Sequence, residues 1–138
     1  MEAKPNSIKL VAGGFSLELQ AVVYKTDPVI LNTNLRVSVV CGNFSGAMTM
    51  DVGSLEIEKF VHQISSMNKD MKGSARIEEP YSNHCYLEFE MDKTGHVQVR
   101  GKLVEGTQQM SFESNFDQTY LPGFVKQLWD TDAWQEVK

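Results

Sequence analysis

The chain has 138 residues, of which 41% are hydrophobic and 22% charged, and its formal net charge at pH 7 is −5. This length and balance predict one globular domain over residues 1–138 with a substantial hydrophobic core. They argue against a membrane, because no apolar run reaches the roughly 20 residues that span a bilayer. They also argue against nucleic acid, because phosphate binding depends on clustered Lys and Arg, which are scattered here.

Targeting signals and cysteines bear on the compartment. Residues 1–14 carry charge and a proline where a secretion signal needs a continuous apolar segment, so we expect no secretion. Cys41 and Cys85 are too few for a disulfide framework, and both fall on inward-facing positions of predicted strands. We therefore expect buried free thiols in a reducing compartment, and a cytoplasmic protein.

The first half of the chain is predicted to form antiparallel strands. After a short edge strand at residues 8–11, residues 15–24 alternate between apolar and polar side chains. A period of two is typical of a strand with one buried face. Residues 35–50 alternate in the same way around the turn residues Gly42-Asn43, which predicts a β-hairpin.

A helix is predicted after this hairpin, ending near Asn68. Ser54 precedes its first apolar residue, and we expect the Ser54 hydroxyl to cap the N-terminus of the helix. Apolar residues then recur at the spacing of one helical face. These residues are Leu55, Ile57, Phe60, Val61 and Ile64.

The second half repeats this order of strands followed by a helix. Alternating segments predict strands at residues 75–78, 85–92, 97–104 and 110–116. Leu121, Phe124 and Leu128 then lie at helical spacing. Between the last strand and this helix, either Asp117 or Thr119 is predicted to provide the helix cap.

The two halves form a weak internal repeat, over residues of about 15–70 and 73–130. Residues 35–64 and 99–128 align without gaps, with apolar positions matching apolar positions. Each half leaves one apolar strand face that needs cover, and a helix with an apolar stripe can supply it. We predict an α+β fold in which an antiparallel sheet of about seven to eight strands carries two helices, built as two strand-hairpin-helix halves.

Catalytic and metal-binding patterns are missing from the sequence. His62, His84 and His96 are not at metal-ligand spacing with one another, and no CxxC or HExxH pattern is present. His84 adjoins Cys85, but a strand cysteine that points into the core is inert. We predict no catalytic residues, no metal site and no cofactor.

Acidic residues cluster on one predicted strand. Glu88, Glu90 and Asp92 share one parity and are expected on its outer face. General acid–base catalysis needs a desolvated carboxylate, which an exposed sheet face does not offer. We expect these residues instead to pair across strands with Arg100 and Lys102.

The C-terminal tail carries the candidate partner-binding residues. Trp129 is expected to pack at the end of the second helix, whereas Trp134 has no assigned core face. Trp134 is therefore either an interface anchor or a residue that folds back on the sheet edge. The predicted partner-binding residues are Asp130, Asp132, Trp134 and Glu136.

A family resemblance runs through several segments, taken in order. They are Asn34-Leu35-Arg36-Val37, Leu55-Glu56 with Phe60, Ile77-Glu78-Glu79-Pro80, Leu87-Glu88-Phe89, Gly95-His96-Val97-Gln98-Val99 and Phe116-Asp117-Gln118-Thr119-Tyr120-Leu121. Together they resemble the WapI-like immunity proteins and their uncharacterised relatives, over residues of about 15–129. In that family a Trp often follows the Asn of the first segment, whereas here Leu35 follows Asn34.

The resemblance implies a small cytoplasmic bacterial protein that neutralises a cognate polymorphic toxin by binding it, with no cofactor and no turnover. We therefore expect a non-enzymatic binding protein whose partner is a basic toxin domain, since opposite charges speed capture. Two alternatives stay open: a self-associating structural domain, and a small-ligand-binding domain with a pocket between sheet and helices. Both a monomer and a homodimer fit the sequence.

Overall fold

The strands of this protein divide into two antiparallel sheets. The structure is a computed structural model that describes residues 7–24, 32–80, 84–130 and 134–137. The first sheet contains β1 (Ile8–Ala12), β2 (Phe15–Tyr24), β3 (Asn32–Cys41) and β4 (Phe44–Gly53), in that order. The second contains β5 (Gly73–Glu78), β6 (Tyr86–Met91), β7 (His96–Glu105) and β8 (Gln108–Asp117), also in chain order. A short strand β9 (Trp134–Val137) pairs parallel with β2.

Two α-helices complete the described part of the chain. They are α1 (Ser54–Asp70) and α2 (Leu121–Trp129), the second preceded by the 3-10 turn η1 (Gln118–Tyr120). The predicted α+β class and the two strand-hairpin-helix halves are confirmed. The strands nevertheless form two sheets: β1 to β4 pair with one another and with β9, whereas β5 to β8 pair only with one another. Across the described residues, no helix has the length and apolar character needed to cross a membrane.

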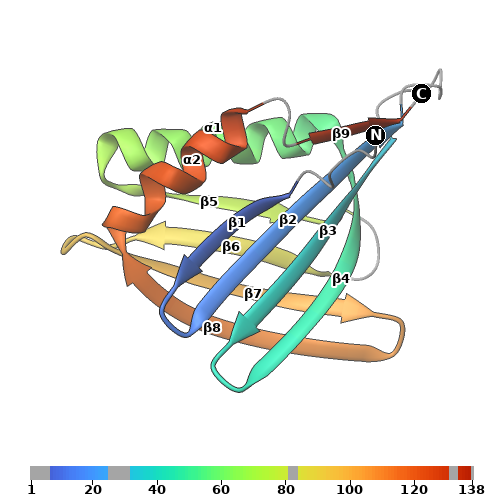
Figure 1. The fold of residues 1–138 in the computed structure, drawn as a ribbon, viewed down its shortest axis with the longest axis horizontal. Helices are drawn as coiled ribbons and strands as arrows, with labels where there is room; N and C mark the ends of the chain where they lie inside the picture. The colour runs from blue at the N-terminus through green and yellow to red at the C-terminus, as the bar shows by residue number, and fades with distance from the viewer. Residues whose placement is uncertain (1–6, 25–31, 81–83, 131–133, 138) are drawn as a thin grey trace, which may run out of the picture.

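The two sheets cross one another and are closed on one side by the helices (Figure 1). At one end of the molecule β4 contacts β7, and β3 contacts β8. On the side where β1 and β5 lie, α1 contacts β5, α2 contacts β1, and the two helices contact each other. The helices therefore cover the apolar surface that the two sheets leave uncovered between them.

Phenylalanine rings link both sheets to both helices. The ring centroid of Phe89 in β6 lies 5.9 Å from Phe60 of α1 and 5.8 Å from Phe124 of α2. Phe89 also contacts Phe116 of β8, which stacks on Phe15 of β2 with centroids 6.3 Å apart. Offset and edge-to-face rings of this kind stabilise a core beyond their burial alone. One continuous hydrophobic core is thus shared by both halves of the chain.

Gly101 is required by close packing inside the second sheet. A Cβ at this position of β7 would lie 2.7 Å from the ring of Phe112 and 2.7 Å from the carbonyl oxygen of Tyr86. The neighbouring backbone cannot move aside as the end of a flexible side chain can. The strand residue therefore has no room for a side chain, which explains a glycine in the middle of an alternating strand.

The helix caps differ from those predicted. α1 begins at Ser54 itself, Gly53 occupies the N-cap position, and no side chain caps it. The prediction for Ser54 is wrong because β4 runs directly into the helix, which leaves no linker residue to serve as a cap. Asp117 does cap, but it caps η1, where its Oδ2 accepts a hydrogen bond from the backbone N–H of Thr119 at 3.0 Å.

Thr119 therefore donates to the cap and does not provide it. The extra turn of η1 separates β8 from α2, so the residue at the N-cap of α2 is Tyr120, which makes no side-chain capping bond. Hydrogen bonds from the side chain and the backbone N–H of Thr119 hold the pKa of Asp117 below its usual value.

Candidate functional site

The described residues hold no group of three or more His, Cys, Asp or Glu side chains able to bind a metal ion. The ring of His62 packs edge-on against Trp129, with centroids 5.0 Å apart. His96 Nδ1 lies 2.8 Å from the Thr94 hydroxyl within the β6–β7 turn. These contacts account for two of the three histidines, His62 and His96, as structural residues.

The two cysteines are free thiols, as predicted, but they differ in burial. Cys85 is buried, and burial followed by the charge of Glu79 raises the pKa of its thiol. Because the thiolate is the nucleophile, such a cysteine is poorly reactive at neutral pH. Cys41 is only partly buried, which corrects the expectation for that residue. It sits at the end of β3, beside the turn of the β3–β4 hairpin.

The C-terminal tail returns to the first sheet. Trp129 packs at the end of α2 as predicted, where its indole N–H donates to Ser65 Oγ of α1. The backbones of Trp134 and Glu136 lie opposite Ala21 and Val23 of β2 in the parallel β9 pairing. The tail thus extends the edge of the sheet.

The other predicted partner-binding residues lie in the segment that follows α2. Asp130 is exposed directly after α2. Asp132 lies outside the described residues, as do the side chains of Trp134 and Glu136. Their role in binding stays a prediction.

The outer face of the second sheet is a network of paired charges. Arg100 of β7 donates to Glu88 Oε1 at 3.1 Å and to Glu90 Oε1 at 3.4 Å, which confirms the predicted cross-strand pairing for these residues. Arg76 of β5 extends the network through Glu88 at 3.5 Å and Glu78 at 3.1 Å. Charges that are satisfied within the sheet leave this face without need of a partner.

Asp92 and Lys102 do not join that network. Asp92 follows β6, and its Oδ1 accepts hydrogen bonds from the backbone N–H groups of Thr94 and His96, which organises the turn. Lys102 lies opposite Tyr86, not opposite a carboxylate. The predicted pairing was wrong for these two residues. Asp92 lies in the turn after β6, and Lys102 faces Tyr86, the first residue of that strand.

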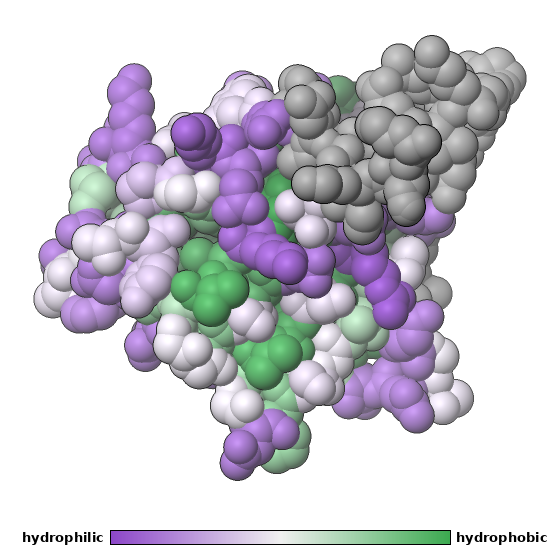
Figure 2. All heavy atoms as spheres, viewed as in Figure 1, coloured by the Kyte–Doolittle hydropathy of each residue, from purple (hydrophilic) through white to green (hydrophobic). Residues whose placement is uncertain are grey.

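One end of the outer face of the first sheet carries small and apolar residues. Val11, Ser16, Val40 and Ser45 form one cross-strand row on β1 to β4. Val11 is 61% exposed and Val40 is 45% exposed. Figure 2 shows hydrophobic residues among near-neutral ones over these strands. Together with Ser38 and Ala47 of the next row, which also contains Lys9 and Glu18, these residues make a surface that we call the small-residue face.

Side chains of the helices seal the outermost strand of each sheet on the helical side. The amide of Gln127 in α2 accepts from the backbone N–H of Lys9 in β1 and donates to the Lys9 carbonyl oxygen, both at 2.8 Å. Gln63 of α1 accepts from the backbone N–H of Arg76 in β5 at 2.9 Å. Each amide thus satisfies backbone groups that the strand pairing leaves free.

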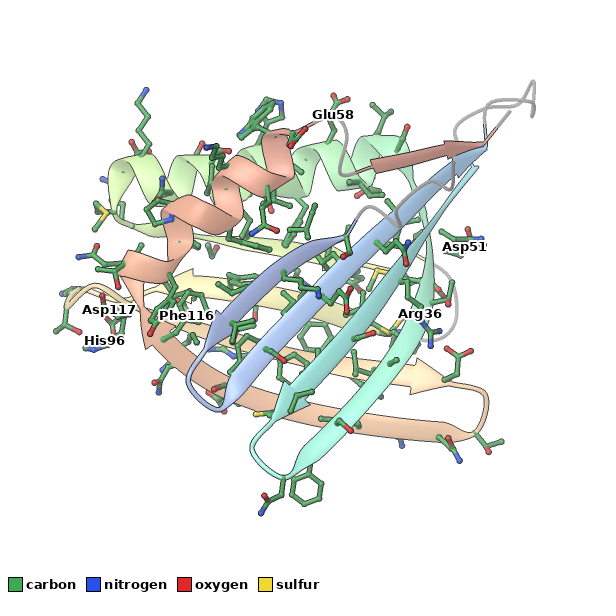
Figure 3. All side chains as sticks on the ribbon, in the orientation of Figure 1. Arg36, Asp51, Glu58, His96, Phe116 and Asp117 are labelled. Carbon is green, nitrogen blue, oxygen red and sulfur yellow. The ribbon has the colours of Figure 1, made fainter. Side chains whose placement is uncertain are left out.

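Carboxylates of the second sheet seal the free edge of β4. Glu105 Oε1 accepts from the backbone N–H of Thr49 at 3.1 Å, and Glu79 Oε1 accepts from that of Asp51 at 2.9 Å. Asp51 lies near the end of β4, three residues before α1 begins (Figure 3). Glu79 is 6% exposed and is the one buried charged residue among those described. Two residues from distant parts of the second sheet thus occupy this edge.

The remaining edge, that of β8, borders a groove. Within the described chain, β8 pairs with β7 and with no other strand. A groove of about 530 Å³ lies between residues 109–113 of β8 and the β3–β4 hairpin. The hairpin contributes Cys41, Ser45 and Phe44, whose side chain is 72% exposed. The groove was not predicted from the sequence, although a phenylalanine directly after a turn was a signal for an exposed aromatic residue.

The structure is thus an α+β protein of two crossed antiparallel sheets closed by two helices. No curated protein matches the chain in sequence. The crystal structures of Trypanosoma brucei MRP1/MRP2 are similar, with a TM-score of 0.52 and 9% identity over 94% of this chain and 84% of that one. This likeness shows the fold alone. The model of the immunity protein WapI-like family matches residues 8–131, and the chain therefore belongs to the WapI-like immunity protein family.

Proposed function

We propose that this protein neutralises a cognate bacterial toxin by binding it directly and that it catalyses no reaction. The family match over residues 8–131 carries this proposal. The surface supports it, since the groove beside β8, with the exposed ring of Phe44, is of the kind that a protein partner contacts. The raised pKa of the Cys85 thiol and the turn contacts of His96 give no support to a catalytic alternative.

The toxin partner in this proposal is a basic domain that meets the immunity protein in the cytoplasm. The net charge of −5 favours the encounter, because complementary charges raise association rates and make them dependent on salt. The free thiols Cys41 and Cys85 suit a reducing compartment. Asp130, Asp132, Trp134 and Glu136 remain proposed contributors to the interface.

Titration against the toxin encoded beside the gene tests this function. Purified protein added to the active toxin should abolish its activity at an equimolar ratio, and cells that express the protein should survive the toxin. Raising the salt concentration should slow association. Complete inactivation by far less than one equivalent would indicate turnover instead of binding. Absence of both binding and protection would overturn the proposal.

A further inference from the structure

We infer that the free edge of β8 is the docking strand for the toxin, and that it takes up an extended basic segment of the toxin by strand addition beside Phe44. This inference rests on the proposed function and specifies how that partner is held. In strand addition, backbone hydrogen bonds provide affinity, and pockets for alternate side chains provide specificity. The β8 edge differs from the edges of β1, β4 and β5 in the features that this mode requires.

The first feature is a row of outward backbone N–H groups, although the Glu113 carbonyl in this row accepts from Cys41. In an antiparallel pair, every second residue directs its N–H and C=O away from the neighbouring strand. The backbone N–H of Gln118 donates to Gly95 at 3.0 Å, and the Glu113 carbonyl oxygen accepts from Cys41 Sγ at 3.6 Å. The backbone N–H and C=O groups of the even-numbered residues of β8 thus point toward β7. Those of the odd-numbered residues point away from β7, to the open edge. The outward residues are Gln109, Ser111, Glu113, Asn115 and Asp117.

The second feature is the contrast with the sealed edges. Side chains satisfy backbone N–H groups on β1, β4 and β5, through Gln127, through Glu79 and Glu105, and through Gln63. In the described chain, no side chain accepts from an outward N–H of β8 between residues 109 and 115. Open edges invite pairing with another chain, and proteins ordinarily block them. The open edge of β8, where those of β1, β4 and β5 are blocked, is therefore a site for a partner strand.

The third feature is the groove along this edge. Phe44 stands on the inner-face parity of β4 and yet is 72% exposed, because the β3–β4 hairpin extends past β8. Met110 and Phe112 of β8 line the same groove. A strand added to β8 would place every second side chain against these apolar groups. The groove thus provides a pocket for alternate side chains of a bound segment.

Charge identifies the occupant of the groove. The outward residues of β8 include Glu113 and Asp117 and no basic residue. Arg100 lies opposite Glu113, but its guanidinium donates to Glu88, Glu90 and Gln98. Pairing of β8 with a second copy of itself would bring these acids together, and like charges on facing strands are destabilising. A segment carrying Lys or Arg has the complementary charge.

The substitution Ser111→Pro tests the backbone contribution. It removes an N–H that faces outward and leaves the hydrogen bonds to β7 intact. Strands tolerate proline at such an edge position. We expect toxin affinity to fall at least about tenfold. The matched controls are Ser111→Ala, which keeps the N–H, and Val40→Glu on the small-residue face, and both should bind as the wild type does. Thermal unfolding near the wild-type temperature establishes that Ser111→Pro is folded.

Hydrogen exchange on the wild-type complex gives a second measurement that needs no variant. The amides of Ser111 and Glu113 should become protected when the toxin binds. Unchanged exchange of these two amides would overturn the assignment of β8 as the docking strand. So would a loss of toxin binding in Val40→Glu but not in Ser111→Pro. Either result would leave the proposed function standing. If the wild type is a dimer and Ser111→Pro dissociates it, the β8 edge binds a second copy of this chain, and the toxin-docking assignment is overturned. Failure of the wild type to bind the toxin would instead overturn the proposed function.

Discussion

The edges of β4 and β8 are two solutions to one physical problem. Each strand is the last of its sheet along the topological path, and each has free backbone groups on one side. Carboxylates of Glu79 and Glu105 accept from the N–H groups of β4, whereas the edge of β8 opens on the groove beside Phe44. This fold thus blocks edges with side chains from the other half of the chain or from the helices, so that an unblocked edge stands out.

The largest expected effect comes from the strand behind the open edge. Gly101→Ala places a methyl group 2.7 Å from the Phe112 ring and the Tyr86 carbonyl oxygen, and should lower the free energy of unfolding by about 3 kcal/mol through overpacking. Urea denaturation measures the change. Gly14→Ala, whose Cβ would meet nothing within 4 Å, is the matched control and should be near neutral. Equal effects of the two substitutions would contradict the packing explanation.

The two carboxylates that seal β4 should differ in strength. Glu79→Ala removes a buried, charged acceptor and should cost about 2 kcal/mol of unfolding free energy. Glu105→Ala removes an exposed one that water replaces, and should cost about 0.5 kcal/mol. Denaturant midpoints of the two variants give the comparison. A cost for Glu105→Ala as large as that for Glu79→Ala would show that burial does not set the strength of this seal.

The seal on β1 can be opened without touching the core. Gln127→Ala removes both hydrogen bonds to Lys9 and should cost about 1 kcal/mol. The amide of Lys9 should also exchange its hydrogen faster, because its N–H then faces water. Lys126→Ala, at the preceding residue of α2, should change neither the free energy of unfolding nor the exchange rate of Lys9. An unaltered exchange rate at Lys9 in the Gln127 variant would mean that the side-chain amide of Gln127 does not protect the edge of β1.

The smallest expected effect is a pH dependence at the far end of β8, where Asp117 and His96 lie opposite one another (Figure 3). The pKa of Asp117 is lowered by its hydrogen bonds from Thr119. Stability from a depressed carboxylate pKa is present above the unfolded value of about 3.9 and is lost as the pH falls through the folded pKa.

Asp117→Asn should therefore flatten the fall of the melting temperature between neutral pH and the acid range below about pH 4. Asp70→Asn, at the exposed end of α1, is the matched control and should keep the wild-type slope. Melting temperatures measured across this range decide the matter. A wild-type slope in the Asp117 variant would remove the cap as a source of acid sensitivity.

Sequence patterns predicted the local structure well because their physical causes are local. Alternation identified the strands and their buried faces, including the pairing of Arg100 with Glu88 and Glu90. The cap at Ser54 failed because a cap depends on where the preceding strand ends, and β4 continues to Gly53. Cys41 failed for a related reason, since its parity is inward but its hairpin extends past the other sheet.

The sequence by itself determined which residues form strands and helices and which side of each strand is apolar. These properties depend on neighbours a few positions apart, through the periods of two and 3.6 residues. Only the tertiary structure decided that the strands form two sheets, and which edges are sealed. Those features depend on contacts such as Lys9 with Gln127 and Asp51 with Glu79, between residues far apart in the chain. No local sequence period indicates such long-range contacts, so the open edge of β8 is apparent only in the folded protein.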